Sequence, residues 1–459
     1  MSRAGKINLE DEKQQELELE HGVGSEQERR QEAALARKIL FKIDTRVMPI
    51  LALLLLCSFL DRTNVGNAKI LGLESDVGIT DTQYSQGLAV FYATYIACEL
   101  PSNLVLKKFS PRIWLPTLTV AWGIITMCLG FIRSFGSFAA VRALLGVAEG
   151  GLFPGIVLYL SSMYTRGELA LRIGIFYTAA SLSGAFGGLL ARGLSAIGPR
   201  GGLEGWRWIF IVEGLLNQTD SLSSSYSPAL EAEEAFKWSE VRRGLFNVQI
   251  WLTSTAYFAM LSGVYSFGLF LPTIVNALQI TTNANKVQLW TVIPYAVATP
   301  TTVAVALISD RIKLRGLPML VMLPISIIGY ATIAHVQSAS VRFGMTCLMA
   351  MGMYSSVPCV LVWNANNSAG HYKRATTSAL QLAVANCGGF VATFVYPNRE
   401  GPVYLKGHSI ILGLLCYAWF AVLVNVLWLS KINRDKKMGK YDQYAGCGDD
   451  RDPEFEMIL

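Results

Sequence analysis

Long apolar stretches recur along the whole chain, and each is close to the length that crosses a lipid bilayer. An α-helix needs about 20 mostly apolar residues to cross ~30 Å of hydrocarbon. Eleven stretches meet this requirement, and they are continuous rather than alternating between apolar and polar residues as in a transmembrane β-barrel. The pattern predicts an all-α polytopic membrane protein with spans near 47–66, 86–106, 114–132, 137–161, 173–194, 247–275, 288–309, 317–336, 341–363, 375–396 and 407–430.

A twelfth apolar stretch, from Trp206 to Leu216, is unusually short. Its 11 residues give only ~16 Å of helix, and a polar run begins at Asn217. A crossing is still required here, because with an odd number of spans the later loops rich in Lys and Arg would face the opposite side from the earlier ones. We therefore expect twelve spans with a truncated sixth helix, and we expect about 20 further residues in the true protein after Leu216.

The composition excludes several other classes of protein. Hydrophobic residues make up 52% of the 459 residues and charged residues only 16%, whereas soluble domains carry roughly 25% charged residues. The eight cysteines are scattered, unlike those of a disulfide scaffold, and the net charge of +6 is spread too thinly for a nucleic-acid binder. Walker, GxSxG and HExxH motifs are absent from the sequence, which predicts neither an enzyme nor a metal or cofactor site.

These features divide the chain into five predicted segments. We expect both termini in the cytoplasm, because the basic loops fit one side of the membrane if twelve spans separate the ends. The tail is mixed in charge and is expected to be disordered. The segments are a cytoplasmic N-terminal segment (1–46), an N-terminal bundle (47–216), a cytoplasmic central loop (217–246), a C-terminal bundle (247–430) and a cytoplasmic tail (431–459).

The two halves of the chain repeat each other. Arg172 and Arg374 are separated by 202 residues, and so are Gly187 and Gly389. Two parallel six-helix halves are the architecture of the major facilitator fold, in which the substrate binds between the halves near the middle of the membrane. The fold class that we predict is this one.

Several motifs then point to a family. They are SFLDRTNVGNAKI from Ser58, ELPSNLVLKKFSPRIWLP from Glu99, RALLGVAEGGLFPG from Arg142, GWRWIFIVEGLL from Gly205 and GHYKRATTSALQL from Gly370. Together they resemble the anion:cation symporter family of the major facilitator superfamily. Within it, the chain is most similar to the fungal allantoate-permease branch and its nicotinic acid transporter-like members.

The resemblance implies a function. It implies a proton-coupled symporter of the plasma membrane that imports a small organic anion, first of all a monocarboxylate such as nicotinate. The driving ion would be the proton, with no other cofactor, and the expected partners are the anion, protons and the lipid bilayer, with no nucleic acid. We expect a monomer.

Four charged residues lie within the predicted spans, where ionisable groups are costly and mark functional sites. They are Asp61 and Arg62 in the first span and Arg142 and Glu149 in the fourth. A guanidinium can hold a carboxylate with two hydrogen bonds, and a buried carboxyl can exchange a proton near neutral pH. The resemblance likewise assigns anion binding and proton coupling to these positions. We predict Arg62 and Arg142 for substrate binding and Asp61 and Glu149 for proton coupling; alternatively, Asp61 and Arg62 form a structural pair and Arg142 reaches the outer interface.

Further polar and aromatic residues are candidates for the cavity, since an aromatic ring such as that of nicotinate would stack on a tyrosine. Each is alternatively a packing residue. The candidates are Tyr92, Tyr95, Tyr265, Gln381 and Asn386. Lys107, Lys108, Arg112, Asp310 and Arg311 resemble the cytoplasmic gate that latches the two halves, and we expect Glu99 and Glu213 to be gate or structural partners of the loop arginines.

Other functions stay open at this point. The substrate could be allantoate, pantothenate, biotin or another carboxylate. The short sixth helix also leaves open a non-transporting membrane sensor or a defective product.

Overall fold

The computed structural model describes residues 34–35, 37–38, 40–108, 111–153, 155–156, 160, 164, 166–199, 201–224, 238–281, 283–447 and 449–459. Within these residues the chain is helical and contains no β-strand. It divides into two compact units, Met1–Ile50 and Leu51–Leu459. In the first unit residues 40–46 and 48–50 are helical, and the Thr45 hydroxyl donates to the Phe41 carbonyl at 2.8 Å.

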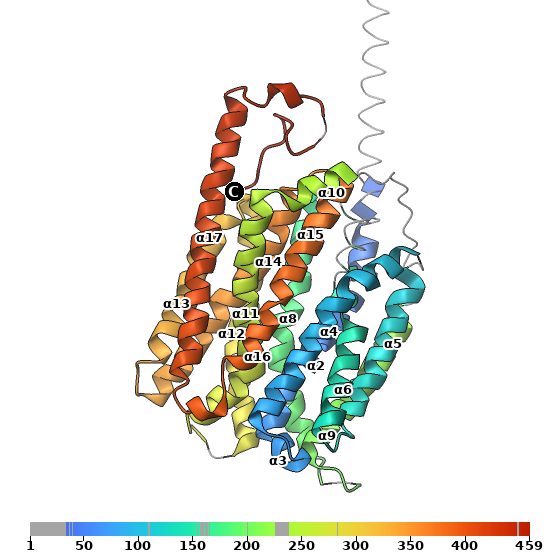
Figure 1. Cartoon of the computed structure of the whole chain (residues 1–459), viewed down its shortest axis with the longest axis vertical. Helices are drawn as coiled ribbons and strands as arrows, with labels where there is room; N and C mark the ends of the chain where they lie inside the picture. Colours follow the sequence, from blue (N-terminus) through green and yellow to red (C-terminus); the bar gives the residue numbers. More distant parts are fainter. Residues whose placement is uncertain are drawn as a thin grey trace, which may run out of the picture. The chain divides into compact units, whose positions relative to one another are not determined.

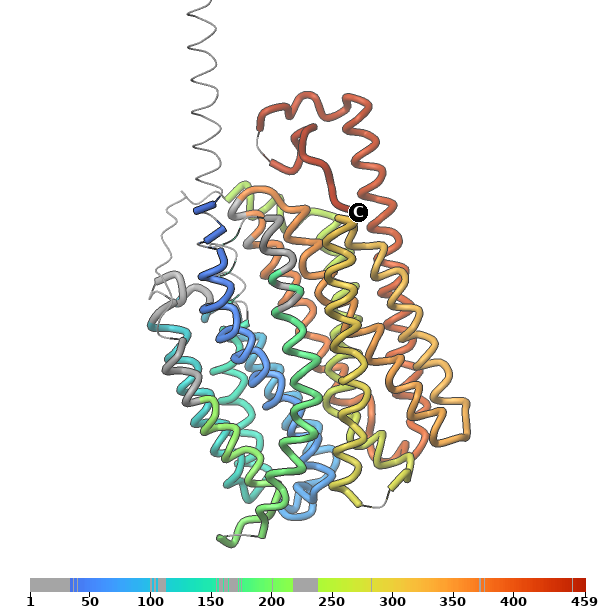
Figure 2. The backbone as a smooth tube through the Cα atoms, turned by 180° about the vertical axis from the view of Figure 1, so that it is seen from behind, coloured from blue at the N-terminus to red at the C-terminus, as the bar shows by residue number. Residues whose placement is uncertain are grey.

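The second unit holds nearly all of the helices. Figure 1 shows them running side by side, with α10 and the C-terminus at one end and α3 at the other, and Figure 2 gives the reverse view. The helices are α2 (Met48–Ile70), which starts in the first unit, α3 (Leu73–Val77), α4 (Asp81–Lys108), α5 (Pro111–Leu129), α6 (Phe135–Glu149), α8 (Arg166–Ser195), α9 (Gly205–Ser224), α10 (Trp238–Leu245), α11 (Val248–Ala277), α12 (Ala284–Ile312), α13 (Gly316–Ile333), α14 (Ala339–Asn366), α15 (His371–Asn386), α16 (Gly388–Phe394) and α17 (Leu405–Lys437), with short 3₁₀ turns at Asn398–Glu400 and Asp442–Tyr444.

The helices pack as two halves. In the first half α5 packs on α6 and α9, and α4 packs on α6; in the second half α13 packs on α14 and α17, and α11 packs on α17. The halves meet where α8 lies against α12 and α14, and where α4 lies against α15 and α16. Gly188 allows one of these approaches, since a Cβ atom there would lie 2.6 Å from the Gln288 carbonyl oxygen. The predicted major facilitator architecture is confirmed.

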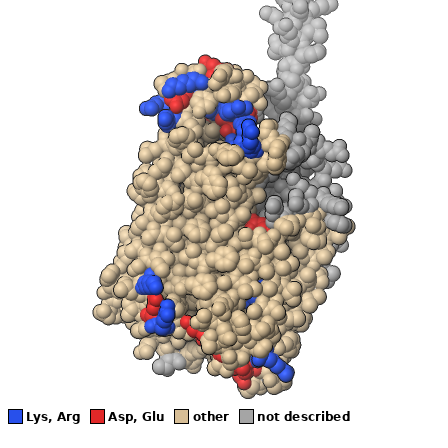
Figure 3. Space-filling view, in the orientation of Figure 1, with Lys and Arg blue, Asp and Glu red and all other residues tan. Residues whose placement is uncertain are grey.

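Each of the twelve predicted spans overlaps a helix, with α15 and α16 together forming the eleventh. By length and composition six helices of the described residues are apolar enough to cross a membrane, and Ile113–Leu129 is a shorter apolar helix. Helices such as α4 and α8 carry polar residues along their length and are not among these six. Figure 3 shows charged side chains gathered mainly at the two ends of the visible face, which leaves a broad band with few charges between them.

The sixth membrane helix differs from the prediction. Helix α9 does not end at Leu216 but continues to Ser224, a length of 20 residues, or ~30 Å. No Gly or Pro interrupts the segment from Leu215 to Ser224. The first polar residue, Asn217, is buried, and its side-chain amide donates to Asp61 Oδ2 at 2.9 Å. Helix α9 is therefore longer than its apolar stretch, and the start of the predicted central loop is helical, but α9 is not among the six helices of the described residues that are apolar enough to cross a membrane.

The predicted disordered tail also differs from the structure. Helix α17 extends to Lys437, and the described residues that follow it fold back. The Lys436 ammonium donates to the carbonyl oxygens of Asp450, Asp452 and Phe455 at 2.7, 2.9 and 2.6 Å. These three bonds hold residues 450–455 of the tail against the end of α17.

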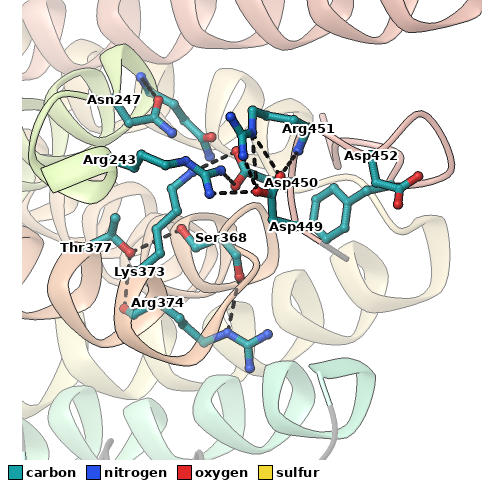
Figure 4. A network of polar contacts seen from close by, with 12 residues as sticks. Arg243, Asn247, Ser368, Lys373, Arg374, Thr377, Asp449, Asp450, Arg451 and Asp452 are labelled. Carbon is teal, nitrogen blue, oxygen red and sulfur yellow. Dashed lines mark hydrogen bonds and ion pairs between the residues drawn. The ribbon is translucent and has the colours of Figure 1, made fainter. Parts of the chain in front are cut away.

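Ion pairs then join the tail to the ends of other helices of the second half (Figure 4). Asp450 pairs with Lys373 of α15 at 2.7 Å and with Arg243 of α10 at 2.9 Å. Arg243 also pairs with Asp449 at 2.6 Å. Farther along, the Ile458 amide nitrogen donates to Asn367 Oδ1 at 2.8 Å, which places the last residues beside the end of α14.

Candidate substrate and proton site

A small cavity of about 10 Å³, room for about one water molecule, lies where the two halves meet. Its walls come from α2, α4 and α8 of the first half and α11 and α15 of the second. Five of the eleven lining residues are apolar. The polar lining residues are Arg62, Tyr95, Tyr177, Tyr257, Tyr265 and Asn386.

Arg62 is the charged residue of the cavity wall, and it contacts both halves. Its Nε donates to Glu149 Oε1 at 2.8 Å, and the two side chains are 6% and 0% exposed. Its Nη1 donates to the Tyr265 hydroxyl at 3.2 Å. The guanidinium carbon also lies 4.6 Å from the ring centroid of Tyr95, a distance typical of a cation–π contact. Arg62 therefore has one counter-ion, Glu149, and faces aromatic rings where a second anion could enter.

A chain of hydrogen bonds continues from Arg62 across the cavity. The Tyr265 hydroxyl donates to Asn386 Oδ1 at 2.8 Å, and Asn386 Nδ2 donates to Glu99 Oε2 at 3.1 Å. The chain thus links α2, α11, α15 and α4. Glu99 is buried and bonded to Asn386, rather than to a loop arginine as the sequence had led us to expect.

Glu149 has a partner that the sequence analysis missed. The Ser58 hydroxyl donates to Glu149 Oε1, the same oxygen that accepts from Arg62. Ser58 lies four residues before Arg62, so the two share a face of α2, and this spacing is the signal that would have identified Ser58. The other carboxyl oxygen, Oε2, is buried without a hydrogen-bond partner.

Arg142 is buried to 1% exposure on α6, but its surroundings differ from those of Arg62. Its Nε and Nη2 have no hydrogen-bond partner. The guanidinium carbon lies 5.7 Å from the ring centroid of Phe91 and 5.8 Å from that of Phe138. Although Arg142 and Glu149 lie two turns apart on one helix, Glu149 takes Arg62 as its ion-pair partner. Arg142 is thus a buried cation with unused donors.

Asp61 points away from the Arg62–Glu149 pair. Its Oδ2 accepts from the Thr126 hydroxyl at 3.0 Å and from Asn217 Nδ2 at 2.9 Å. Glu213 lies nearby on α9, where one of its oxygens accepts from Asn64 Nδ2. Asp61 therefore does not form a structural pair with Arg62, and Glu213 is not a partner of a loop arginine.

The remaining predicted cavity residues divide into two groups. Tyr95, Tyr265 and Asn386 line the cavity. Tyr92 is not part of the lining, and its ring is tilted by 44° against that of Tyr265, with the centroids 5.2 Å apart. Gln381 is buried against α14, where its Nε2 donates to the Val360 carbonyl at 3.1 Å.

Two cavity tyrosines were missed by the sequence analysis. Tyr257 lies eight residues before Tyr265 on α11, and this helical spacing could have revealed it. Tyr177 lies on α8, where its ring centroid is 6.0 Å from that of Phe59. No charge or motif marks Tyr177 in the sequence.

The predicted gate residues lie toward the loops. Asp310, near the end of α12, accepts from Arg315 Nη2 at 2.9 Å in the turn that follows, and Arg311 is exposed. The side chains of Lys107, Lys108 and Arg112 lie outside the residues that the structure describes in full. A latch between the halves stays a prediction.

Fold, apolar helices and a cavity between two helical halves define a membrane transporter, and comparison with known proteins gives its family. The model of the Major Facilitator Superfamily matches residues 51–393. The chain belongs to this superfamily. Its matched relatives are transporters rather than enzymes.

Three known proteins illustrate the similarity. An uncharacterized transporter of Schizosaccharomyces pombe is 32% identical over 453 residues, which cover 92% of this chain and 90% of the relative. The high-affinity nicotinic acid transporter of Saccharomyces cerevisiae is 30% identical over 459 aligned positions, with 92% and 85% covered. The crystal structure of a bacterial homolog of the human lysosomal transporter Spinster, inward-facing and unoccupied, matches with a TM-score of 0.62 at 17% identity, over 83% of this chain and 96% of that one.

Proposed function

We propose that this protein is a proton-coupled symporter that imports a small organic anion, most specifically an aromatic monocarboxylate such as nicotinate. The observation that carries the proposal is the position of Arg62. It lines the cavity between the halves, and its guanidinium contacts Glu149 on one side and Tyr265 of the other half on the other. A carboxylate that enters the cavity meets a cation already held in place.

Competition for Arg62 supplies a coupling mechanism. While Glu149 is ionised, it occupies the Nε of Arg62. A proton on Glu149 would weaken this ion pair and free the guanidinium for the substrate carboxylate, so the anion and the proton would bind together. Asp61 is the second carboxyl that we assign to proton coupling, since it is buried in the same half.

The cavity favours an aromatic substrate. Four tyrosines line it, and the guanidinium of Arg62 lies over the ring of Tyr95. A planar ring can stack on such faces, and its carboxylate can then reach Arg62. Similarity to a nicotinic acid transporter at 30% identity supports the same choice over allantoate or pantothenate. Membership of a superfamily of transporters supports transport over a non-transporting sensor or a defective product.

Uptake in whole cells tests the substrate. A yeast strain that lacks nicotinate uptake should accumulate labelled nicotinate when it expresses this protein, more at acidic than at neutral external pH, and a protonophore should abolish the accumulation. The matched comparison is nicotinamide, which has the same ring without the carboxylate and should not be taken up. Equal uptake of both compounds would contradict recognition through Arg62.

A further inference from the structure

We infer that the second half carries a binding site for the main chain of a non-helical peptide segment, and that residues 457–459 of this chain fill it. These three residues, here called the strap, have no regular secondary structure. Each of them is bound through its backbone groups by residues near the ends of α13, α14 or α17. The site therefore recognises a peptide by its main chain, and its occupant is the protein's own tail.

Two asparagines each hold one strap residue by both of its main-chain groups. Asn367, which follows the last residue of α14, accepts from the Ile458 amide nitrogen and donates to the Ile458 carbonyl oxygen, both at 2.8 Å. Asn433 of α17 binds Met457 in the same way, at 2.9 and 2.8 Å. A side-chain amide carries an acceptor and a donor side by side, so it matches the two groups that a peptide main chain presents.

Further donors bind the carbonyl oxygens of the strap. The Trp363 indole Nε1 donates to the Ile458 carbonyl oxygen at 2.7 Å. At the start of α13 the amide nitrogens of Arg315 and Gly316 donate to the Leu459 carbonyl oxygen at 2.6 and 3.2 Å. Every carbonyl oxygen of the strap thus has a donor, and the strap ties three helices of the second half together.

Burial shows that these groups are built around the strap. Trp363 and Asn367 are both 0% exposed, so their polar side-chain groups are matched by the strap rather than by water. The side chains of Ile458 and Leu459 are only partly buried, whereas that of Met457 is 6% exposed. The Ile458 side chain therefore contributes less to recognition than the main-chain groups beside it.

The bound tail also restrains α15. Upstream of the strap, Asp450 pairs at 2.7 Å with Lys373, in the first turn of α15. Asn367 lies just before this helix, so the tail holds the connection between α14 and α15 from both sides. Because α15 supplies Leu382 and Asn386 to the cavity wall, release of the tail should loosen an element of that wall.

Hydrogen–deuterium exchange of the purified full-length protein tests the site without any substrate. In the wild type the amides of Met457 and Ile458 should exchange slowly, because each donates to an asparagine. Asn367→Leu keeps a side chain of similar size but removes both hydrogen-bonding groups, and it should make this exchange about tenfold faster. Asn366→Leu, the same change one residue earlier at a half-buried position, is the matched control and should leave the exchange slow.

Two changes in the strap separate main-chain from side-chain recognition. Ile458→Pro removes the amide hydrogen that Asn367 accepts, and it should speed exchange at Met457 and at the start of α15. Ile458→Ala keeps the main chain and should leave both slow. Slow exchange within α11, which is buried along most of its length, verifies in each variant that the protein is folded.

Either of two results would overturn the site. One is exchange in Asn367→Leu as slow as in the wild type. The other is exchange in Ile458→Ala as fast as in Ile458→Pro, because the side chain would then hold the strap. If Asn367→Leu does not fold, the two changes at Ile458, which lies outside the helices, decide the question by themselves.

Discussion

Arg142 holds two guanidinium nitrogens that are buried and have no hydrogen-bond partner. A buried charge without a hydrogen-bond or ion-pair partner lowers the stability of the fold unless an anion binds to it. Arg142 does not line the cavity, and its role in anion binding remains a prediction. The two arginines differ in that Arg62 has an ion-pair partner, whereas Nε and Nη2 of Arg142 have no partner among the described residues.

Replacing Arg142 should therefore have opposite effects on binding and on stability. Arg142→Lys keeps the charge but loses the planar fork, and it should weaken anion binding substantially, since a lost buried charged contact costs roughly 2–5 kcal/mol. Arg142→Met should abolish binding and raise the apparent melting temperature, because it removes an uncompensated buried charge. Binding is measured with labelled nicotinate on purified protein, and stability by thermal unfolding without ligand. Wild-type affinity in both variants would remove Arg142 from the site.

At the scale of helices, the sequence predicted the helix positions correctly where apolar runs are long. It failed where contacts between helices determine where a helix ends. The positions of α2, α11 and α17 follow from their hydropathy. The end of α9 could not be predicted, because Asn217 remains helical through a bond to Asp61, which lies 156 residues away in the sequence. Likewise, the four charges at membrane depth were recognised, but their pairing was not, since Glu149 meets Arg62 of another helix.

The extended α9 makes a prediction about stability. Asn217→Ala removes one of the two donors to Asp61 Oδ2, and leaving a buried acceptor short of a partner costs roughly 1–3 kcal/mol. The apparent melting temperature should fall. Leu216→Ala, one residue earlier and 45% exposed, is the matched control and should change it little. Equal melting temperatures for Asn217→Ala and wild type would mean that the helix ends where the sequence predicted.

The docked tail makes a second prediction at this scale. Asp450→Asn breaks ion pairs to Lys373 and Arg243, and removing one partner of a buried pair costs roughly 3–5 kcal/mol. The tail should then be cut faster by trypsin. Glu456→Gln is the control, because its pair with Lys437 is 3.9 Å long and both side chains are more than 70% exposed, at 77% and 74%. A wild-type rate of cleavage for Asp450→Asn would contradict a docked tail.

The pH dependence of the tail follows from Asp449. Burial alone would raise its pKa, but hydrogen bonds from Arg451 and Cys447 and the charge of Arg243 hold the pKa below its usual value. A carboxylate with a lowered pKa stabilises the folded form above its unfolded pKa, and this contribution is lost as the pH falls through the folded pKa. Protection of the tail from proteolysis should thus be constant around neutral pH and decline only in strong acid.

For the whole molecule, the main expectation is orientation in the membrane. The basic residues Arg243, Lys373 and Lys436 gather with the tail at one end, and positive residues favour the cytoplasmic side. Cys447 is exposed in the tail. A membrane-impermeant thiol reagent should therefore label it only after the cells are permeabilised.

Two variants make the labelling test specific. Because Cys128 and Cys416 are also exposed, both are first replaced by Ser, and Cys447→Ser should then lose the label. Ser75→Cys in the Cys447→Ser background places a thiol at an exposed position of α3, at the opposite end, and should be labelled in intact cells. Labelling of Cys447 in intact cells would mean that the α10 end faces outward.

Proteoliposomes that contain the purified protein test proton-coupled anion transport most directly. With an imposed inward proton gradient, the wild-type protein should concentrate labelled nicotinate, and collapse of the gradient should abolish this. Glu149→Gln should lose accumulation, because glutamine cannot bind the proton that the Glu149 carboxylate accepts. It should still exchange labelled for unlabelled nicotinate, because Arg62 remains to bind the anion. Gradient-driven accumulation by Glu149→Gln equal to wild type, or wild-type accumulation that ignores the gradient, would contradict the account.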